Sequence, residues 1–363
     1  MSLMGTLTMV DGDRVLAFGH SMMSSGENDL PLALGRVQSV VPSIQFSFRF
    51  TGTDRVIGRV TRDIDSAVAG RLGEEAPMFP CTVTVKGARS GTFNYRIAGY
   101  WQLSPFLAFY AAAASAERWQ GTSNLFTVKA TSRIRLKGRE EPIVLENLHV
   151  GYSPATPAFS QVWLPLGMLM FNPFQEVEIT GLEVEHEVEE GLRAAWIESV
   201  RLGHQEVEPG GNVELFVRLR EYRGEEHVRK IEIQVPPDAE PGSLAQILVT
   251  DSLVQMMMDF GYDPGLMDPK NLEDLIAVIE RNPPNTHIFA RASFLKRGVR
   301  YEGAAMPELP SSVFTMLSTE PELGVATPLI GDVKSNVETP WVIGGFQRVA
   351  VFVREPGRGG TRY

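Results

Sequence analysis

The stretch Gly5–His20, which reads GTLTMVDGDRVLAFGH, combines clear strand signals with a histidine. Two runs of alternating apolar and polar residues flank Asp11-Gly12, a dipeptide typical of a tight hairpin turn. The second run ends at Gly19-His20. A histidine at the end of a strand is held by its scaffold and is still open to a partner, as a general base must be. The sequence therefore predicts a β-hairpin that presents His20.

A second segment extends the pattern downstream. Val56–Val85, VIGRVTRDIDSAVAGRLGEEAPMFPCTVTV, reads as a strand-turn-strand unit followed by a strand bounded by proline. With the GTLT strand and the FGH motif, it resembles the SpoIVB-type (stage IV sporulation protein B) serine peptidase family over residues 5–98. The resemblance implies a chymotrypsin-like partial β-barrel, a protein or peptide substrate and an extracytoplasmic location. It also implies that His20 is the general base.

A general-base histidine needs an acidic partner that orients the ring and stabilises the imidazolium. Asp63 and Asp65 lie in the matched segment, and Asp29 is a third candidate. We expect one of these carboxylates within about 4 Å of the His20 ring, or one water away. The alternative is that the aspartates are turn and cap residues and that His20 itself caps a turn.

The nucleophile that the family implies is missing from this chain. Those peptidases carry it in a Gly-x-Ser-Gly-x-Pro loop, and no such motif occurs in the 363 residues. The nearest string, Gly87–Gly91, has the wrong spacing and reads as a hairpin turn. We therefore expect a truncated polypeptide, with Met1-Ser2-Leu3 as a leader, that is inactive alone. The competing hypothesis is a non-catalytic extracytoplasmic scaffold that binds a protein or glycan.

Composition excludes several classes of function. The net charge of −10 argues against a nucleic-acid partner, because binding to phosphates needs clustered Lys and Arg. The single Cys81 excludes an internal disulfide and reads as a small buried hydrophobe. The sequence contains no zinc-ligand pairing and no phosphate-binding glycine loop, so no cofactor or metal is expected. The most apolar stretch, Phe159–Phe174, is too short for a membrane span.

The sequence predicts a first domain over residues 1–155, mostly of short strands. Asn28-Asp29 reads as the cap of a helix, with Leu30, Leu34, Val37 and Val41 near helical spacing. Ser104-Pro105 starts a clearer helix over residues 105–120, whose broad apolar surface predicts that it is largely buried. The loop at residues 151–159 reads as the boundary.

Residues 156–250 resemble a bacterial immunoglobulin-like β-sandwich, with alternating strands from Val177 to Val249. Phe216 is out of phase with its neighbours and should be partly exposed. Glu183–Glu189 alternates acidic and apolar residues, which favours a solvated face or a protected edge. The residues expected on the inward faces include Trp196, Leu215, Val217, Leu219, Ile231, Ile233 and Leu248.

Residues 251–363 predict a small α+β region, with the option that it packs back on the first domain. NLEDLIAVIERN, starting at Asn271, reads as a helix that Pro283-Pro284 ends. A short helix is expected from Leu309, and the chain closes with the strand FQRVAVFVRE. The sequence thus predicts a mainly β, multidomain protein.

Overall fold

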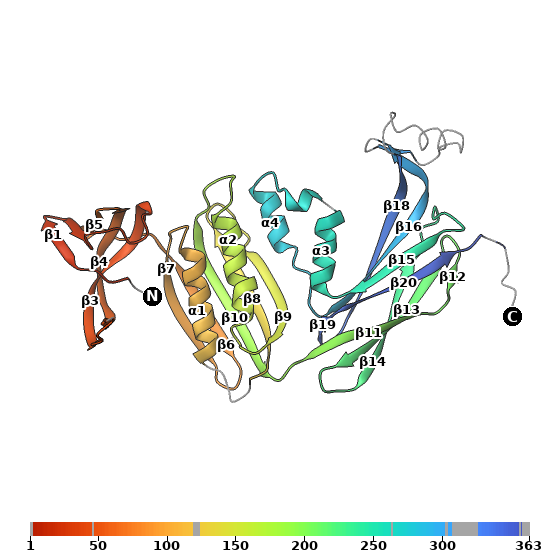
Figure 1. Ribbon diagram of the computed structural model, residues 1–363, viewed down its shortest axis with the longest axis horizontal. Helices are drawn as coiled ribbons and strands as arrows, with labels where there is room; N and C mark the ends of the chain where they lie inside the picture. Colours follow the sequence, from red (N-terminus) through yellow and green to blue (C-terminus); the bar gives the residue numbers. More distant parts are fainter. Residues whose placement is uncertain are drawn as a thin grey trace. The chain divides into compact units, whose positions relative to one another are not determined.

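The computed structural model describes residues 3–45, 47–118, 124–262, 264–301, 304–306, 326–355 and 357. Unit 1 comprises Met1–Asn147, Gly151–Gly191 and Pro269–Asn282, and unit 2 comprises Leu148–Val150, Leu192–Asp268 and Pro283–Tyr363. Strands in several sheets dominate the fold, which confirms the predicted mainly β, multidomain class (Figure 1). The short helix expected from Leu309 lies outside the described residues.

The N-terminal part of unit 1 is a five-stranded antiparallel sheet that forms a half-barrel. Its strands lie in the order β1-β2-β5-β4-β3. Its buried apolar side chains are Val15, Ala17, Val60 and Val68. The strand bounds are β1 Leu7–Asp11, β2 Arg14–Ala17, β3 Gly26–Val41, β4 Phe48–Ile64 and β5 Ala67–Leu72. The hairpin predicted around Asp11-Gly12 is present as β1 and β2, which pair from Leu7 to Ala17.

The helix predicted after Asn28 is wrong, because that segment is strand β3. It pairs with β4 from Gly26 opposite Asp63 to Val41 opposite Phe48. The apparent cap residue Asn28 accepts a hydrogen bond from the Leu30 amide, a local turn contact that does not start a helix. Pairing along the whole of β4 outweighs the weak helical spacing of the apolar residues.

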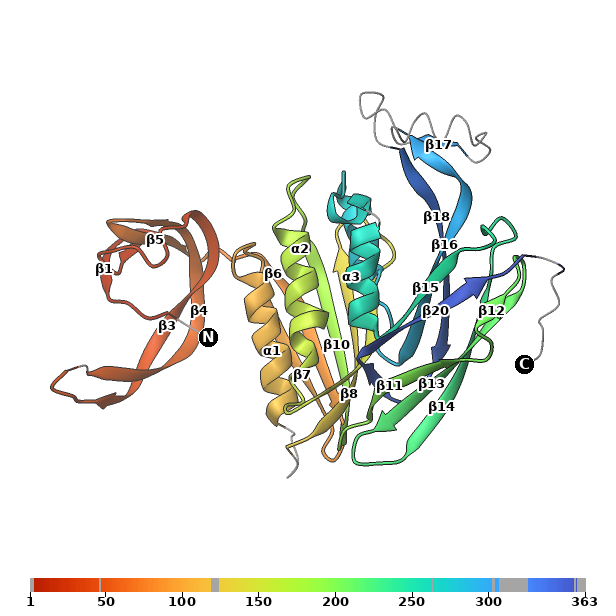
Figure 2. The same ribbon diagram turned by 45° about the vertical axis from the view of Figure 1, so that its right-hand side comes forward.

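The second sheet of unit 1 has the order β7-β6-β10-β8-β9. Its helices are α1 (Ser104–Arg118), a π-helical turn over Phe159–Trp163, α2 (Leu164–Met170) and α4 (Leu272–Glu280). Figures 1 and 2 show α1 and α2 against one face of this sheet, and their buried residues share one core with it. The strands are β6 Met78–Lys86, β7 Gly91–Ala98, β8 Phe126–Leu136, β9 Ile143–Gly151 and β10 Ile179–Glu190.

The central strand β10 decides where unit 1 ends in the sequence. It pairs in parallel with β6, Leu182 lying opposite Cys81, and antiparallel with β8. The segment 156–250 is therefore divided between the two units, since residues up to Gly191 belong to unit 1. Helix α4, from the C-terminal region, also contributes buried residues to the core of unit 1.

The acidic residues of β10 form a solvated face, as predicted, but not on an edge strand. Glu183 pairs with Arg135 at 3.2 Å, and Glu185 and Glu187 lie 2.5 Å and 3.4 Å from the Lys86 ammonium. On the other side of the strand Val184 and His186 are buried. Cations on the neighbouring strands thus balance the carboxylates of β10.

Unit 2 is a sandwich of two sheets on one shared core. One sheet has the order β14-β13-β11-β19 and the other β12-β20-β15-β16-β17, with β18 beside β16. Helix α3 (Ser252–Tyr262) and a 3-10 turn (Pro264–Met267) follow β15. The strands are β11 Ala194–Leu202, β12 Glu206–Val207, β13 Asn212–Glu221, β14 Glu226–Gln234, β15 Leu244–Thr250, β16 His287–Tyr301, β17 Ala304–Met306, β18 Ala326–Glu338, β19 Val342–Gly344 and β20 Phe346–Val353.

Most of the predicted inward residues are correct, and Phe216 is 36% exposed, as expected. Two expectations are wrong. Trp196 is 44% exposed, with Ala195 and Ile197 buried on either side of it. Leu248 is half-buried, and its neighbours in β15 fill the core instead. The second sheet uses β16, β18 and β20, so residues 177–249 do not contain the whole sandwich.

Candidate functional site

His20 lies on a tight loop between β2 and β3. Phe18 and Gly19 precede it, both with φ of 71°, and Ser24 follows with φ of 52°. In the described part of the chain, the non-glycine residues with positive φ are Phe18, Ser24 and Arg223. A left-handed conformation at Phe18 and Ser24 costs about 1–3 kcal/mol each. The surrounding structure must therefore hold this loop in place.

The exposed His20 ring has a defined orientation. Its Nδ1 atom lies 2.6 Å from the main-chain carbonyl oxygen of Ser21. A carbonyl oxygen can only accept, so Nδ1 carries the proton, and in the neutral ring Nε2 is the basic nitrogen. The ring also meets Phe18 edge to face at 6.0 Å. A Cβ atom at Gly5 would lie 2.5 Å from the Phe18 ring, so glycine is needed there.

Asp63 holds the loop through hydrogen bonds to its main chain. Its fully buried carboxylate accepts hydrogen bonds from the amides of Met22 and Met23, both at 2.7 Å. The amide and hydroxyl of Ser25 donate to it at 3.3 Å and 3.2 Å. Burial raises the pKa of Asp63, but the amide donors outweigh burial, and its pKa lies below the ordinary value. Asp63 is therefore ionised at neutral pH and holds the loop.

The predicted acid partners of His20 do not meet its ring. Asp63 binds the main chain of the loop, and Asp29 pairs with Arg59 at 2.6 Å. Asp65 lies 3.4 Å from the Ser24 hydroxyl, which also contacts the Ser21 hydroxyl at 2.9 Å. Within the described residues, no ion pair joins His20 to a carboxylate. The Ser21 carbonyl orients the ring instead, a role that no sequence motif signals.

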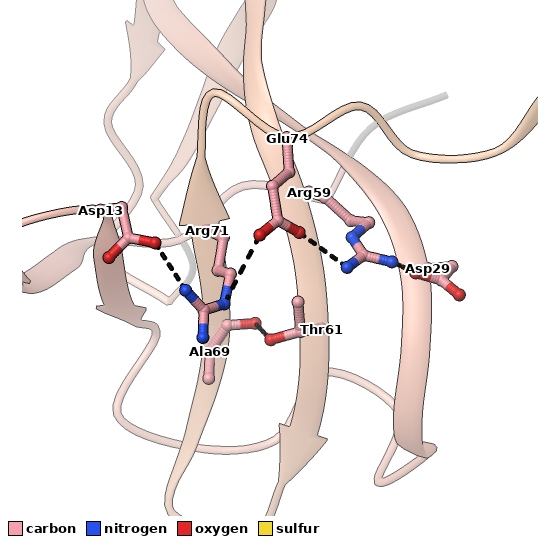
Figure 3. Close-up of polar contacts among 7 residues, drawn as sticks. All are labelled: Asp13, Asp29, Arg59, Thr61, Ala69, Arg71 and Glu74. Atoms are coloured by element: carbon pink, nitrogen blue, oxygen red, sulfur yellow. Dashed lines mark hydrogen bonds and ion pairs between the residues drawn. The ribbon is translucent and has the colours of Figure 1, made fainter.

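A chain of ion pairs crosses the sheet that carries the loop (Figure 3). Asp13 pairs with Arg71 at 2.6 Å, Arg71 with Glu74 at 3.6 Å, and Glu74 with Arg59 at 2.7 Å. Asp29 completes it through Arg59. A hydrogen bond from Arg71 lowers the pKa of Asp13. These partly exposed pairs each add little stability, but together they join the β1–β2 turn, β5, β4 and β3.

The Cys81 side chain is part of the core of unit 1. Burial raises the pKa of the Cys81 thiol to about 12, in agreement with its predicted place in the core. In the part of the chain that the structure describes, no three His, Cys, Asp or Glu residues are grouped to hold a metal ion. Nor does any helix of the described residues have the length and apolar character to cross a membrane.

Comparison of the chain with protein-family models, with curated proteins and with solved structures gave no match.

Proposed function

We propose that unit 1 carries the general-base half of a serine endopeptidase site, with His20 as base and the nucleophilic serine on polypeptide outside these 363 residues. The observation that supports this proposal most directly is the contact of His20 Nδ1 with the Ser21 carbonyl, because it leaves Nε2 as the basic nitrogen of an exposed ring. The resemblance to the SpoIVB-type family supports the same role and adds an extracytoplasmic location to the proposal.

The loop geometry supports a catalytic role over a purely structural one. Glycine is the residue that adopts left-handed conformations most easily, and although Arg223 in the β13–β14 turn is an isolated exception, Phe18 and Ser24 both adopt them within one loop. The buried Asp63 carboxylate offsets that strain with four hydrogen bonds. Strain that is held so firmly is typical of sites that must present one side chain accurately.

The chemistry follows from the tautomer. Nε2 of His20 would take the proton of the serine hydroxyl as its oxygen attacks the scissile carbonyl carbon. The imidazolium keeps its Nδ1 hydrogen bond to Ser21, whose carbonyl dipole stabilises the positive charge. When the C–N bond breaks, Nε2–H returns the proton to the leaving amine, and the acyl-enzyme remains for hydrolysis.

The 363-residue chain by itself should be inactive. Because it lacks the nucleophile loop, we expect no labelling by a fluorophosphonate probe and no cleavage of casein above background. Mass spectrometry of the probe-treated chain measures the result. Stoichiometric labelling of any of its serines would contradict the proposed division of the site.

The polypeptide translated from the natural start of the reading frame should react with the probe at one serine outside this chain. His20→Gln should slow that reaction about 10²- to 10⁴-fold, because general-base assistance is lost. His204→Gln is the control, since His204 is an exposed histidine of unit 2. If no serine reacts, or if His20→Gln matches the control, the scaffold hypothesis is the better one.

A further inference from the structure

The hairpin of β3 and β4 extends beyond the other strands of the half-barrel. Strand β5 pairs with β4 over Gly58–Ile64, whereas β3 continues to pair with β4 as far as Val41 opposite Phe48. Residues 33–56 therefore form a two-stranded ribbon with its connecting loop, here called the arm, and Figure 2 shows it projecting from the half-barrel. The nine strand residues 33–41 span about 25–30 Å, so the arm presents its tip well away from the other strands.

The outer part of the arm exposes large apolar side chains on both faces and at its tip. Phe48 and Phe50 lie on one face, are 53% and 55% exposed, and contact each other at 5.5 Å between ring centres. Val40, opposite Arg49 in the strand pair, lies on the other face and is 55% exposed. Ile44 in the loop is fully exposed. A two-stranded ribbon has no core of its own, so only an external partner can bury these side chains.

The charged residues of the arm lie behind its tip. The sequence from Val37 to Phe48 has no Asp, Glu, Lys, Arg or His, and it is bounded by Arg36 on one strand and by Arg49 on the other. Arg55, further along β4, is also exposed. The one acidic residue of the arm, Asp54, lies 4.0 Å from Arg36. Three arginines against one aspartate give the arm a positive charge in a chain whose net charge is −10.

We propose that the arm inserts its tip into the headgroup region of an anionic lipid bilayer. The apolar side chains of the tip enter the boundary between headgroups and acyl chains, and the arginines behind them contact the lipid phosphates. A bilayer surrounds whatever enters it, so it covers both faces of the ribbon and the loop together. A flat protein surface would cover only one of the two faces.

Electrostatics and main-chain hydrogen bonding set the depth of this insertion. The Debye length is about 8 Å at physiological ionic strength, well below the length of the arm, so carboxylates at the base of the arm are screened from a surface at its tip. Main-chain groups along the edges of a two-stranded ribbon need polar partners, which the hydrocarbon core lacks. The tip therefore stays in the headgroup region.

The arm fits other occupants less well. A second copy would bring an arm of the same positive charge, so the two sets of arginines would repel each other. A strand that adds to the edge of β3 needs a regular row of main-chain donors and acceptors, but the register shifts three times between Leu32 and Ser39. A protein pocket would have to enclose the whole tip. The inference does not depend on the proposed catalytic role of His20.

The test is flotation of the full chain with lipid vesicles. We expect binding to phosphatidylcholine vesicles that contain about 30% phosphatidylglycerol, little binding to phosphatidylcholine alone, and weaker binding as NaCl rises from about 0.1 to about 0.5 M. Phe48→Ser/Phe50→Ser should reduce the partition coefficient at least about 10-fold, because two rings no longer leave water. Arg49→Gln/Arg55→Gln should reduce it about 10- to 30-fold at about 0.1 M NaCl, because two attractions to the anionic surface are lost.

The controls remove the same kinds of side chain elsewhere in unit 1. Phe171→Ser removes an exposed ring, and Arg14→Gln/Arg96→Gln removes two exposed positive charges. Each should leave the partition coefficient within about 2-fold of the wild type, because these groups lie outside the arm and exposed charges beyond a Debye length are screened. Circular dichroism of each variant verifies that it is folded.

Several outcomes would overturn the proposal. One is a wild-type chain that does not bind the anionic vesicles, or that binds neutral vesicles equally well. Another is binding that both arm variants leave unchanged, or that the controls weaken as much as they do. A chain that ignores vesicles but self-associates in sedimentation equilibrium, and loses that association in Phe48→Ser/Phe50→Ser, would assign the arm to a second copy.

Discussion

Phe294→Ala is expected to reduce the free energy of unfolding of unit 2 by about 3–5 kcal/mol. Phe294 lies on β16, is fully buried and belongs to the core shared by both sheets. Removing its ring takes away apolar burial and leaves a cavity that the surrounding close-packed core residues fill only in part. Urea unfolding of the full chain, followed by tryptophan fluorescence, to which Trp196 and Trp341 contribute from unit 2, measures the change.

The matched control is Phe216→Ala on β13. Phe216 is 36% exposed, whereas Leu215 and Val217 on either side are fully buried. Phe216→Ala should therefore reduce the free energy of unfolding by less than about 2 kcal/mol, well under the reduction expected for a buried phenylalanine. Equal losses for the two variants would show that the faces of the sandwich are assigned to the wrong sides.

Asp63→Ala is the second change with a large expected effect. It should reduce the free energy of unfolding of the half-barrel by about 2–4 kcal/mol. The substitution removes the acceptor of the amides of Met22, Met23 and Ser25. Hydrogen bonds to a charged group are the stronger kind, and donors left without an acceptor add to the cost. Asp65→Asn is the control, because Asp65 is exposed and accepts a long hydrogen bond of 3.4 Å from the Ser24 hydroxyl.

The stabilising effect of Asp63 should depend on pH in a defined direction. Its pKa in the folded protein lies below the ordinary value of 3.8. The contribution is therefore complete above the unfolded-state pKa and is lost as the pH falls through the folded-state pKa. The stability difference between the wild type and Asp63→Asn should be constant from about pH 7 to about pH 5 and shrink below about pH 4. A difference that grows on acidification would contradict this assignment.

The site was predictable in part. The position of His20 at a strand end follows from the alternation of GTLTMVDGDRVLAFGH and its Asp-Gly turn. The role of Asp63 does not follow from the sequence. Its carboxylate accepts hydrogen bonds from main-chain amides about 40 residues earlier, and a main-chain amide is not marked by any particular side chain. The contact of the Ser21 carbonyl with His20 could not be predicted for the same reason, since every residue has a main-chain carbonyl.

The error at β3 shows where local patterns mislead. Leu30, Leu34, Val37 and Val41 are spaced nearly as on a helix, and Asn28 resembles a cap. Bulges in the pairing of β3 with β4 shift the register several times, and such shifts disturb the two-residue period of a strand. Bulges depend on the partner strand, so a single segment does not reveal them.

The sequence by itself determined strands β11, β13, β14, β15 and β20 of unit 2, the start of α1 at Ser104-Pro105 and which side of β10 carries carboxylates. These features depend on side-chain alternation and capping, which act over a few residues. Tertiary structure decided that β10 enters the first sheet beside β6, and that β16, β18 and β20 complete the sandwich. Such pairings form between segments far apart in the chain, because burying their apolar faces together stabilises them, and no local pattern encodes which faces will meet.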